Sequence, residues 1–198
     1  MKRLFDFLMS LIAIIILSPV ILIVALAVKF TSPGPILFKQ RRIGKDNIEF
    51  EIYKFRTMRI DTPNVPTHLL ENPEQWITPI GKFLRKTSLD ELPQLFNILK
   101  GEMSIVGPRP ALYNQLDLKE MRTEVGVHKL VPGLTGWAQI NGRDEIPLSL
   151  KVNLDKEYLD RKNFFFDIKI IFMTVLSVLK SDGVQEGKAE NNNETHTV

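Results

Sequence analysis

The most pronounced pattern in the chain is one uncharged, apolar segment near its N-terminus. Twenty-two residues, Phe7 to Val28, carry no charged side chain. As a straight α-helix they would extend about 33 Å, enough to cross the hydrocarbon core of a bilayer. Ser18 and Pro19 interrupt the run at its middle. Pro19 cannot donate to the carbonyl of Ile15, whereas Ser18 can donate to a carbonyl freed in this way. We therefore predict a membrane helix that is broken by a sharp bend at Ser18-Pro19.

Basic residues flank this segment on both sides. Lys2 and Arg3 precede it, and the basic residues that follow are Lys29, Lys39, Arg41, Arg42 and Lys45. Because lysine- and arginine-rich flanks stay on the cytoplasmic side, a re-entrant helix that enters and leaves at one face satisfies both flanks, whereas a span satisfies one. We therefore expect residues 1–30 to form a re-entrant helix with both termini cytoplasmic. A kinked span is the alternative. A secretory signal peptide is less well supported, because basic residues follow the run.

After this segment the pattern changes to short alternating stretches. Ile48, Phe50 and Ile52 alternate with two glutamates, and residues 44–47 supply turn-forming side chains between this stretch and the preceding "PILFKQRRI". This arrangement predicts a β-hairpin. Four prolines then break residues 61–80, for which the sequence indicates a surface excursion and no specific role.

The remaining chain has the periodicity of helices, predicted over residues 84–100, 112–125, 150–162 and 164–180. The last is apolar but contains Asp167 and Lys169, so we expect it to lie in the membrane plane or against the core rather than to span. Asp167 is placed to pair with Lys2 or Arg3. The prediction is a monotopic α+β protein in three parts: the re-entrant helix (1–30), a catalytic domain on the cytoplasmic face (31–183) and a disordered polar tail (184–198).

Composition and charge narrow the chemistry. The absence of cysteine excludes disulfides and thiolate chemistry, and three scattered histidines cannot build a histidine-rich metal cage. A divalent ion would therefore have oxygen ligands, which favours magnesium. Residues 1–60 carry ten Lys or Arg and four Asp or Glu, net +6, while the remainder carries sixteen and nineteen, net −3. Basic charge beside an apolar helix is typical of proteins that bind anionic lipid, and we do not expect nucleic acid as a partner.

The stretch "TSLDELPQL" places two carboxylates, Asp90 and Glu91, side by side. Ser88 followed by Glu91 matches a capping box, and Pro93 also suits a helix start. On these residues alone, capping is the more common explanation and catalysis the less common one.

Three further stretches carry cations or glycines. "GPRP" holds Arg109 between Pro108 and Pro110, which predicts a stiff loop suited to phosphate recognition. "YKFRTM" places Lys54 and Arg56 on one face of the second strand. "PGLTGWAQINGR" supplies three glycines that permit close approach to a ligand, with Thr135, Gln139, Asn141 and Arg143 as donors. Each stretch also has a purely structural explanation, but together with the acid pair they favour phosphoryl transfer.

Taken in this order, the motifs resemble the catalytic core of the small monotopic phosphoglycosyl transferases, the bacterial sugar transferase family that starts glycoconjugate assembly. The resemblance covers about residues 2–183. It rests on "SP" within the apolar helix, "YKFRTM", "RKTSLDELPQLFNILKGEMSIVGPRP" and "PGLTGWAQINGR". Larger members carry additional N-terminal spans, so the chain resembles the minimal form.

The resemblance implies a fold, a reaction and a site. Asp90 would attack the β-phosphate of a UDP-sugar and release UMP, and polyprenol (undecaprenyl) phosphate would then accept the phosphosugar. Glu91 would handle the acceptor's proton, and Mg²⁺ would have Asp90 among its ligands. The residues expected to contact substrate are Arg109, Pro108, Pro110, Arg85, Lys54, Arg143, Thr135 and Gln139. The expected location is the cytoplasmic face of the bacterial inner membrane.

Two other functions compete with this interpretation. One is a membrane-anchored adaptor without enzymatic activity, in which the acid pair only caps a helix. The other is a magnesium-dependent membrane diphosphatase, which would transfer to water. The sequence names neither the sugar nor the glycoconjugate, whether exopolysaccharide, O-antigen, capsule or glycoprotein glycan. A homo-oligomer is compatible with it.

Overall fold

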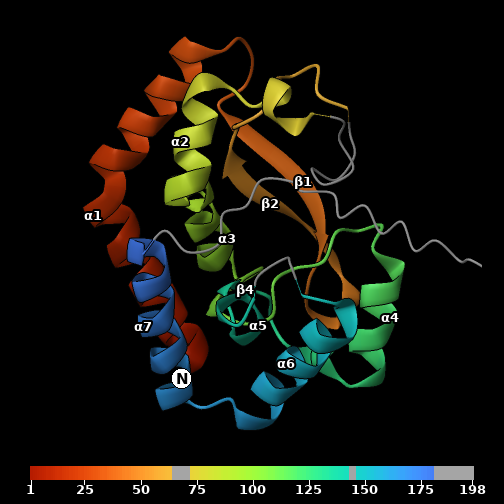
Figure 1. Ribbon diagram of the computed structural model, residues 1–198. Coiled ribbons are helices and arrows are strands. Elements are labelled where there is room, and N and C mark those ends of the chain that lie inside the picture. Colours follow the sequence, from red (N-terminus) through yellow and green to blue (C-terminus); the bar gives the residue numbers. More distant parts are fainter. Residues whose placement is uncertain (64–71, 143–145, 181–198) are drawn as a thin grey trace, which may run out of the picture.

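The apolar N-terminal segment forms one helix, α1 (Lys2–Thr31), in a computed structural model that describes residues 1–63, 72–142 and 146–180. The backbone stays helical through Pro19, and Ser18 Oγ donates a hydrogen bond of 2.8 Å to the carbonyl of Ile15. Figure 1 shows α1 curving along one side of the molecule. The interruption expected at Ser18-Pro19 is therefore a bend within a continuous helix, because the serine satisfies the carbonyl that proline leaves free.

Both ends of α1 pack against the same domain. Near the N-terminus, Arg3 donates to the carbonyls of Ile98 and Leu99 at 2.5 and 2.6 Å. The buried Asp6 carboxylate accepts a hydrogen bond of 2.7 Å from Ser104 Oγ. Near its other end, α1 contributes to an apolar cluster formed by Val24, Val28, Phe55 and Leu84.

The predicted hairpin is confirmed. Strands β1 (Leu37–Ile43) and β2 (Glu49–Phe55) pair in antiparallel register, with Leu37 opposite Phe55. The turn between them contains the short helix η1 (Lys45–Asn47), where Asp46 and Asn47 have φ angles of 54° and 61°. Asp and Asn tolerate this left-handed region better than most residues, which explains the tight reversal.

Asn97 covers the free edge of β2. Its Oδ1 accepts from the N–H of Tyr53 at 3.0 Å, and its Nδ2 donates to the carbonyl of Glu51 at 2.7 Å. The side-chain amide therefore replaces a neighbouring strand at this point and fixes its own helix against the hairpin.

The region around the acid pair is not one helix. It consists of α2 (Pro79–Thr87), a single turn η4 (Leu89–Glu91) and α3 (Gln94–Lys100). Ser88 has φ 56° and ψ 16°, a left-handed conformation that redirects the chain between α2 and η4. The helical character predicted over 84–100 is confirmed, but the segment is divided at Ser88, and the acids lie on a tight turn.

The second half of the chain adds a small parallel sheet and four helices. Strand β3 (Ser104–Val106) pairs with β4 (Gly133–Thr135). The helices are α4 (Leu116–Glu124), α5 (Trp137–Ile140), α6 (Leu148–Arg161) and α7 (Phe164–Lys180). The described part of the chain also contains the short helices η3 (Pro73–Trp76) and η5 (Val127–Lys129). Helices predicted over 112–125, 150–162 and 164–180 are confirmed with small shifts of their ends. The glycine-rich stretch, expected as a loop, contains β4 and α5.

Helix α7 lies beside the N-terminal part of α1 (Figure 1). Lys2 Nζ is 2.6 Å from Asp167 Oδ2, which confirms one of the two predicted pairings. The rings of Phe5 and Phe164 meet edge to face, with centroids 5.5 Å apart. The two helices are thus joined by both a polar and an aromatic contact.

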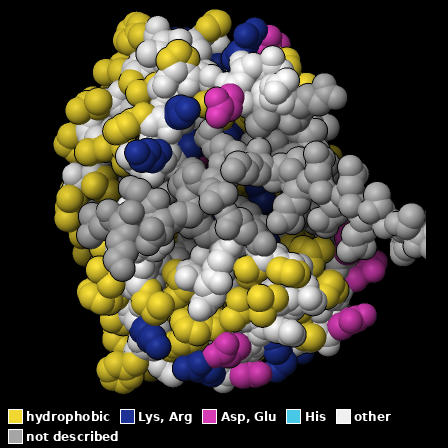
Figure 2. All heavy atoms as spheres, in the orientation of Figure 1, with side chains coloured by type: hydrophobic (Ala, Val, Ile, Leu, Met, Phe, Trp, Pro, Cys, Tyr) yellow, Lys and Arg dark blue, Asp and Glu magenta, His cyan; other side chains and the backbone are white. Residues whose placement is uncertain are grey.

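Apolar side chains of α1 are exposed on both sides of its bend. Its exposed side chains include Ile15, Ile16, Leu22 and Ile23, and α7 adds Phe165 and Phe172. Figure 2 shows apolar side chains along the edge of the molecule where α1 runs. Among the described residues, α1 alone is long and apolar enough to cross a membrane, by length and composition. This is compatible with a monotopic membrane protein.

Candidate active site

Asp90 and Glu91 lie on η4, between the domain core and the cationic loops. Asp90 is 8% exposed. Within the described residues its carboxylate makes no hydrogen bond, although Lys54, Arg85 and Arg109 all lie close enough to affect its ionisation. A buried carboxylate left without a direct donor is costly, which is typical of a group kept available for chemistry.

Glu91 is held directly by two cations. Lys54 Nζ donates to Glu91 Oε1 at 2.6 Å, and Arg109 Nη2 donates to the same oxygen at 3.0 Å. Burial alone would raise the pKa of Glu91, but the charges of Lys54 and Arg109 outweigh it and hold the pKa well below its usual range. The predicted capping box is therefore wrong, because the Glu91 carboxylate is occupied by cations and Ser88 makes no side-chain cap hydrogen bond.

Asp90 shifts in the opposite direction. Burial raises the pKa of Asp90, and the charge of Glu91 adds to this effect, while Lys54 and two arginines oppose it. Two adjacent carboxylates thus have pKa values pushed apart by their surroundings. Such a pair is a recognised sign of divided roles in catalysis.

Arg109 is presented by a loop whose carbonyls are all occupied. The carbonyl of Pro108 accepts from the N–H of Gly133 at 2.9 Å, that of Arg109 from Arg122 Nη1 at 2.8 Å, and that of Pro110 from Arg42 Nη1 at 3.0 Å. The loop is therefore fixed by hydrogen bonds from three other segments as well as by its prolines. This confirms the stiff loop predicted from "GPRP".

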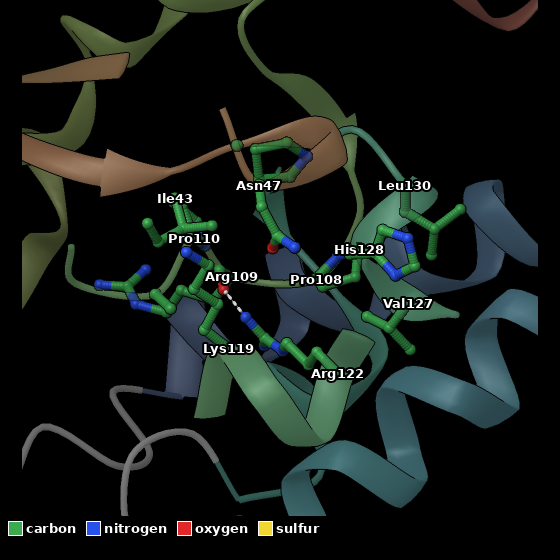
Figure 3. A pocket seen from close by; sticks show the side chains of 13 residues that line it. Ile43, Asn47, Pro108, Arg109, Pro110, Lys119, Arg122, Val127, His128 and Leu130 are labelled. Atoms are coloured by element: carbon green, nitrogen blue, oxygen red, sulfur yellow. Dashed lines mark hydrogen bonds between the residues drawn. The ribbon is translucent and has the colours of Figure 1, made fainter. Parts of the chain in front are cut away.

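A buried ion pair supports this loop from behind. Arg122 on α4 contacts Asp155 on α6 through Nε at 3.0 Å and Nη2 at 2.5 Å, while its remaining nitrogen reaches the Arg109 carbonyl. Figure 3 shows the hydrogen bond from Arg122 to the Arg109 carbonyl. It lies beside a cavity of about 30 Å³, which has room for about two water molecules. This side of the loop is thus packed, and a nucleotide does not fit there.

The glycines of the family motifs bring two backbone segments together. A Cβ on Gly133 would lie 2.1 Å from the Gly107 nitrogen, and one on Gly136 would lie 2.1 Å from the Gly107 carbonyl oxygen. Only glycine permits this approach. Their function in the structure is therefore to seat the Arg109 loop on β4.

The other predicted contact residues have different surroundings. Thr135 Oγ1 is 2.6 Å from Thr174 Oγ1 on α7, and Gln139 Nε2 donates to the carbonyl of Leu134. These two side chains therefore support the fold and are not part of the acid–cation cluster. Arg85 Nε donates to Thr57 Oγ1 at 3.0 Å, near Asp90. Arg143 lies outside the described residues.

Several residues of the site were not singled out from the sequence. Arg122 and Asp155 fix the loop together with Arg42, which the sequence indicated only as a basic residue that flanks the apolar run. Their partners are distant in sequence, so no local pattern indicates this role. Gln94, four residues after Asp90, is 1% exposed, and its Nε2 has no partner among the described residues. A polar residue within "LPQLF" was a visible but weak signal.

A magnesium ion is compatible with the carboxylates present. No cluster of three or more His, Cys, Asp or Glu occurs in the described part of the chain, so no ready-made protein cage exists there. Magnesium commonly binds one or two carboxylates together with substrate phosphates and water. The Asp90 carboxylate, which makes no hydrogen bond to the described residues, fits this requirement.

Comparison with known proteins agrees with the site. Residues 1–181 match the family described as bacterial sugar transferase. A UDP-glucose:undecaprenyl-phosphate glucose-1-phosphate transferase of Escherichia coli (strain K12) is 43% identical over 183 residues, which cover 88% of this chain and 39% of the relative.

Two further relatives differ in length. The uncharacterized sugar transferase EpsL of Bacillus subtilis (strain 168) is 43% identical over 186 residues, which cover 94% of this chain and 91% of the relative. A UDP-N-acetylgalactosamine-undecaprenyl-phosphate N-acetylgalactosaminephosphotransferase of Aeromonas hydrophila is 37% identical over 190 residues, 93% of this chain and 45% of the relative. The chain thus spans less than half of some relatives and nearly all of another.

Proposed function

The chain belongs to the bacterial sugar transferase family, and on this premise we propose that it transfers a sugar 1-phosphate from a UDP-sugar to polyprenol phosphate. The observation that carries the proposal is the acid pair on η4: Asp90 is buried without a hydrogen-bond donor among the described residues, and Glu91 accepts from both Lys54 and Arg109. The names of relatives that use undecaprenyl phosphate support the same reaction. The reaction would be the first membrane step of glycoconjugate synthesis.

Asp90 is the nucleophile in this proposal. A carboxylate oxygen of Asp90 attacks the β-phosphorus of the UDP-sugar, the bond from that phosphorus to the bridging oxygen breaks, and UMP leaves with the electron pair. The enzyme then carries a phosphosugar on Asp90. An oxygen of polyprenol phosphate attacks the same phosphorus, which forms the polyprenol diphosphate sugar and returns Asp90 as a carboxylate.

The cations around the pair suit this chemistry. Arg109 lies on a loop that hydrogen bonds hold rigid, so its guanidinium can meet phosphate without reorganisation. Lys54 and Arg85 add positive charge near Asp90. A bound Mg²⁺, held by Asp90 and the diphosphate, would neutralise charge on the leaving group.

Glu91 has two proposed roles. The sequence-based expectation is that it handles the proton of the acceptor phosphate. Its contacts add that it orients Lys54 and Arg109, because one oxygen accepts from both. The second role needs no proton on Glu91, in keeping with its lowered pKa.

We also propose that α1 is re-entrant and that both termini lie in the cytoplasm. Its two ends contact one domain, through Arg3 and Asp6 at the start and Val28 near the end, whereas its bend carries exposed apolar side chains. A helix that inserts the bend into the lipid keeps both ends at the interface. Reporter fusions at each terminus test this, and reporters on opposite sides of the membrane would refute it.

Incubation of the full chain with a panel of UDP-sugars, magnesium and undecaprenyl phosphate tests the function. We expect UMP release with one donor and a sugar on a lipid diphosphate. Asp90→Asn should abolish transfer without lowering thermal stability, because the substitution replaces a buried charge. Transfer to water would favour the diphosphatase, and no turnover with any donor would favour the adaptor. Unchanged transfer by Asp90→Asn would remove Asp90 as nucleophile.

A further inference from the structure

Thr57 is a buried residue just after the end of β2, and α2 packs on its backbone. The residue is 8% exposed. Its carbonyl oxygen accepts a hydrogen bond of 2.9 Å from the N–H of Thr78, and a Cβ on Gly81 would lie 2.2 Å from the same oxygen. The glycine therefore lets the first turn of α2 approach this carbonyl directly. These contacts fix the position of Thr57 relative to α2.

The Thr57 side chain contacts the same helix about one turn further along. Arg85 Nε donates to Thr57 Oγ1 at 3.0 Å. Thr57 is buried and short, whereas Arg85 is partly exposed and has a long side chain with many rotamers. The threonine is thus the fixed partner of this bond. Because the bond is made through Nε, it sets the direction in which the two terminal nitrogens of the guanidinium point.

The segment that carries Thr57 also carries Lys54. Lys54 Nζ donates to Glu91 Oε1 at 2.6 Å. Lys54 and Arg85 both lie close enough to Asp90 for their charges to act on its carboxyl group. The end of β2 therefore holds one of these cations directly and orients the other through the Thr57 hydroxyl.

We propose that Thr57 is a positioning residue for Arg85, which it orients so that the terminal guanidinium nitrogens meet the diphosphate of the sugar donor. The inference rests on the proposed function for the identity of the donor as a UDP-sugar. A guanidinium forms two parallel hydrogen bonds to phosphate only when its plane is correctly directed. A fork that is already oriented also binds without the entropic cost of ordering a long side chain.

Two substitutions at Thr57 separate this role from a structural one. Thr57→Val keeps the shape of the side chain and removes the oxygen that accepts from Arg85, whereas Thr57→Ser keeps the hydroxyl and removes a buried methyl group. Thr57→Val should lower kcat/KM for the UDP-sugar about tenfold, which the loss of one charge-assisted hydrogen bond can cause. Thr57→Ser should nearly keep this value.

Thermal unfolding of the same two variants should show the opposite order. Thr57→Ser opens a small cavity and should lower the unfolding midpoint more than Thr57→Val does. A purely structural threonine would make the less stable variant the less active one. A larger loss of kcat/KM in Thr57→Ser than in Thr57→Val, or a lower midpoint in Thr57→Val than in Thr57→Ser, overturns the proposal.

A variant of Arg85 tests whether Thr57 acts through this arginine. Arg85→Ala removes the guanidinium, so the addition of Thr57→Val should cause no further loss of kcat/KM. A further tenfold loss in the double variant overturns the proposal. Thr123→Val is the control, because it removes a hydroxyl that contacts Asn47 and Lys119 and neither acid of the pair. It should leave kcat/KM unchanged.

The binding of UDP gives a readout that does not depend on turnover. Calorimetric titration of the full-length protein in lipid nanodiscs, with UDP and magnesium, should show about tenfold weaker binding to Thr57→Val than to the unmodified chain. Unchanged affinity for UDP overturns the proposal.

The two proposals fail in different ways. UMP release by the unmodified chain, together with an unchanged kcat/KM in Thr57→Val, removes the role of Thr57 and keeps the function. Weaker binding of UDP by Thr57→Val, together with no turnover of any UDP-sugar by the unmodified chain, removes the function and keeps the role of Thr57 in phosphate binding.

Discussion

The two sides of the Arg109 loop hold ion clusters of different kinds. On one side, Glu91 accepts from both Lys54 and Arg109, and the Arg109 side chain is 31% exposed. On the other side, Arg122 meets Asp155 one to one, with side chains 9% and 2% exposed. The first cluster is partly open to solvent and has two cations on one carboxylate, whereas the second is closed and neutral.

This difference in burial indicates that one cluster can recognise an anionic ligand, whereas the other supports the Arg109 loop. A deeply buried charge must be matched, because removing it from water is expensive, and the pair Arg122–Asp155 is matched. A partly exposed cluster tolerates a surplus of positive charge because water screens it. That surplus is available to an anionic ligand. We call the partly exposed cluster of Lys54, Glu91 and Arg109 the front cluster and the buried pair Arg122–Asp155 the rear cluster. The rear cluster holds the loop in place, and the front cluster carries the charge that a ligand can meet.

Breaking the rear cluster should have the largest effect on stability. Asp155→Ala leaves Arg122 buried without its partner and should cost about 3–5 kcal/mol, which corresponds to roughly 6–20 °C in the midpoint of thermal unfolding for a chain of this size. The double variant Arg122→Met with Asp155→Leu removes both charges and should recover much of the stability. It should not recover activity, because the hydrogen bond to the Arg109 carbonyl stays lost. An unchanged unfolding midpoint in Asp155→Ala would show that the pair contributes little.

Breaking the front cluster should affect activity and not folding. Glu91→Gln keeps the shape of the side chain but removes the negative charge that binds Lys54 and Arg109. We expect turnover to fall about 100-fold, because misplaced catalytic groups cost about that much. Because the cluster is partly exposed, the unfolding midpoint should change by little. Steady-state UMP release and thermal unfolding of the same preparation measure both quantities. A large loss of stability with normal turnover would contradict the assignment of this cluster to catalysis.

The sequence predicted elements whose signals are local. The apolar run gave α1, the alternation of Ile48, Phe50 and Ile52 gave β2, and the periodic stretches gave α4, α6 and α7. It did not predict the division of the 84–100 helix, because the left-handed conformation of Ser88 depends on tertiary contacts and serine has no strong preference for it.

The sequence predicted several residues of the site but not the contacts that they make in the fold. Lys54, Arg85, Arg109 and the acid pair do come together. Thr135 and Gln139 do not, because hydroxyl and amide groups serve equally well in ligand contacts and in the interior, and here they bond to Thr174 and Leu134. The rear cluster was missed since Arg122 and Asp155 are distant in sequence.

The pH dependence of turnover should sharpen the assignment of the front cluster. The nucleophile must be ionised, and burial raises the pKa of Asp90, so activity should fall on acidification at a pH above the usual range of about 4 for an aspartate. Lys54 lowers that pKa. Lys54→Met should therefore move the acidic limb of the kcat/KM profile to higher pH. Lys39→Met, which changes an exposed lysine of the same hairpin, serves as the control. A limb that stays in place or moves to lower pH would contradict the coupling of Lys54 to Asp90.

The smallest effect is expected at a third ion pair, which joins an exposed cation to a buried carboxylate. Lys2 is 43% exposed on its side chain and contacts Asp167, which also accepts a hydrogen bond of 2.8 Å from the buried Tyr158 hydroxyl. Lys2→Ala should cost about 1 kcal/mol or less, because water replaces the ammonium. Tyr158→Phe should cost more, about 1–3 kcal/mol, because it leaves the buried side of Asp167 without a donor.

Thermal unfolding of both variants in low and high salt checks this order: only the effect of Lys2→Ala should shrink with salt, since screening acts on the exposed partner. If Lys2→Ala proves the more damaging, exposure does not determine what an ion pair contributes in this fold, and the contrast between the front and rear clusters needs another cause.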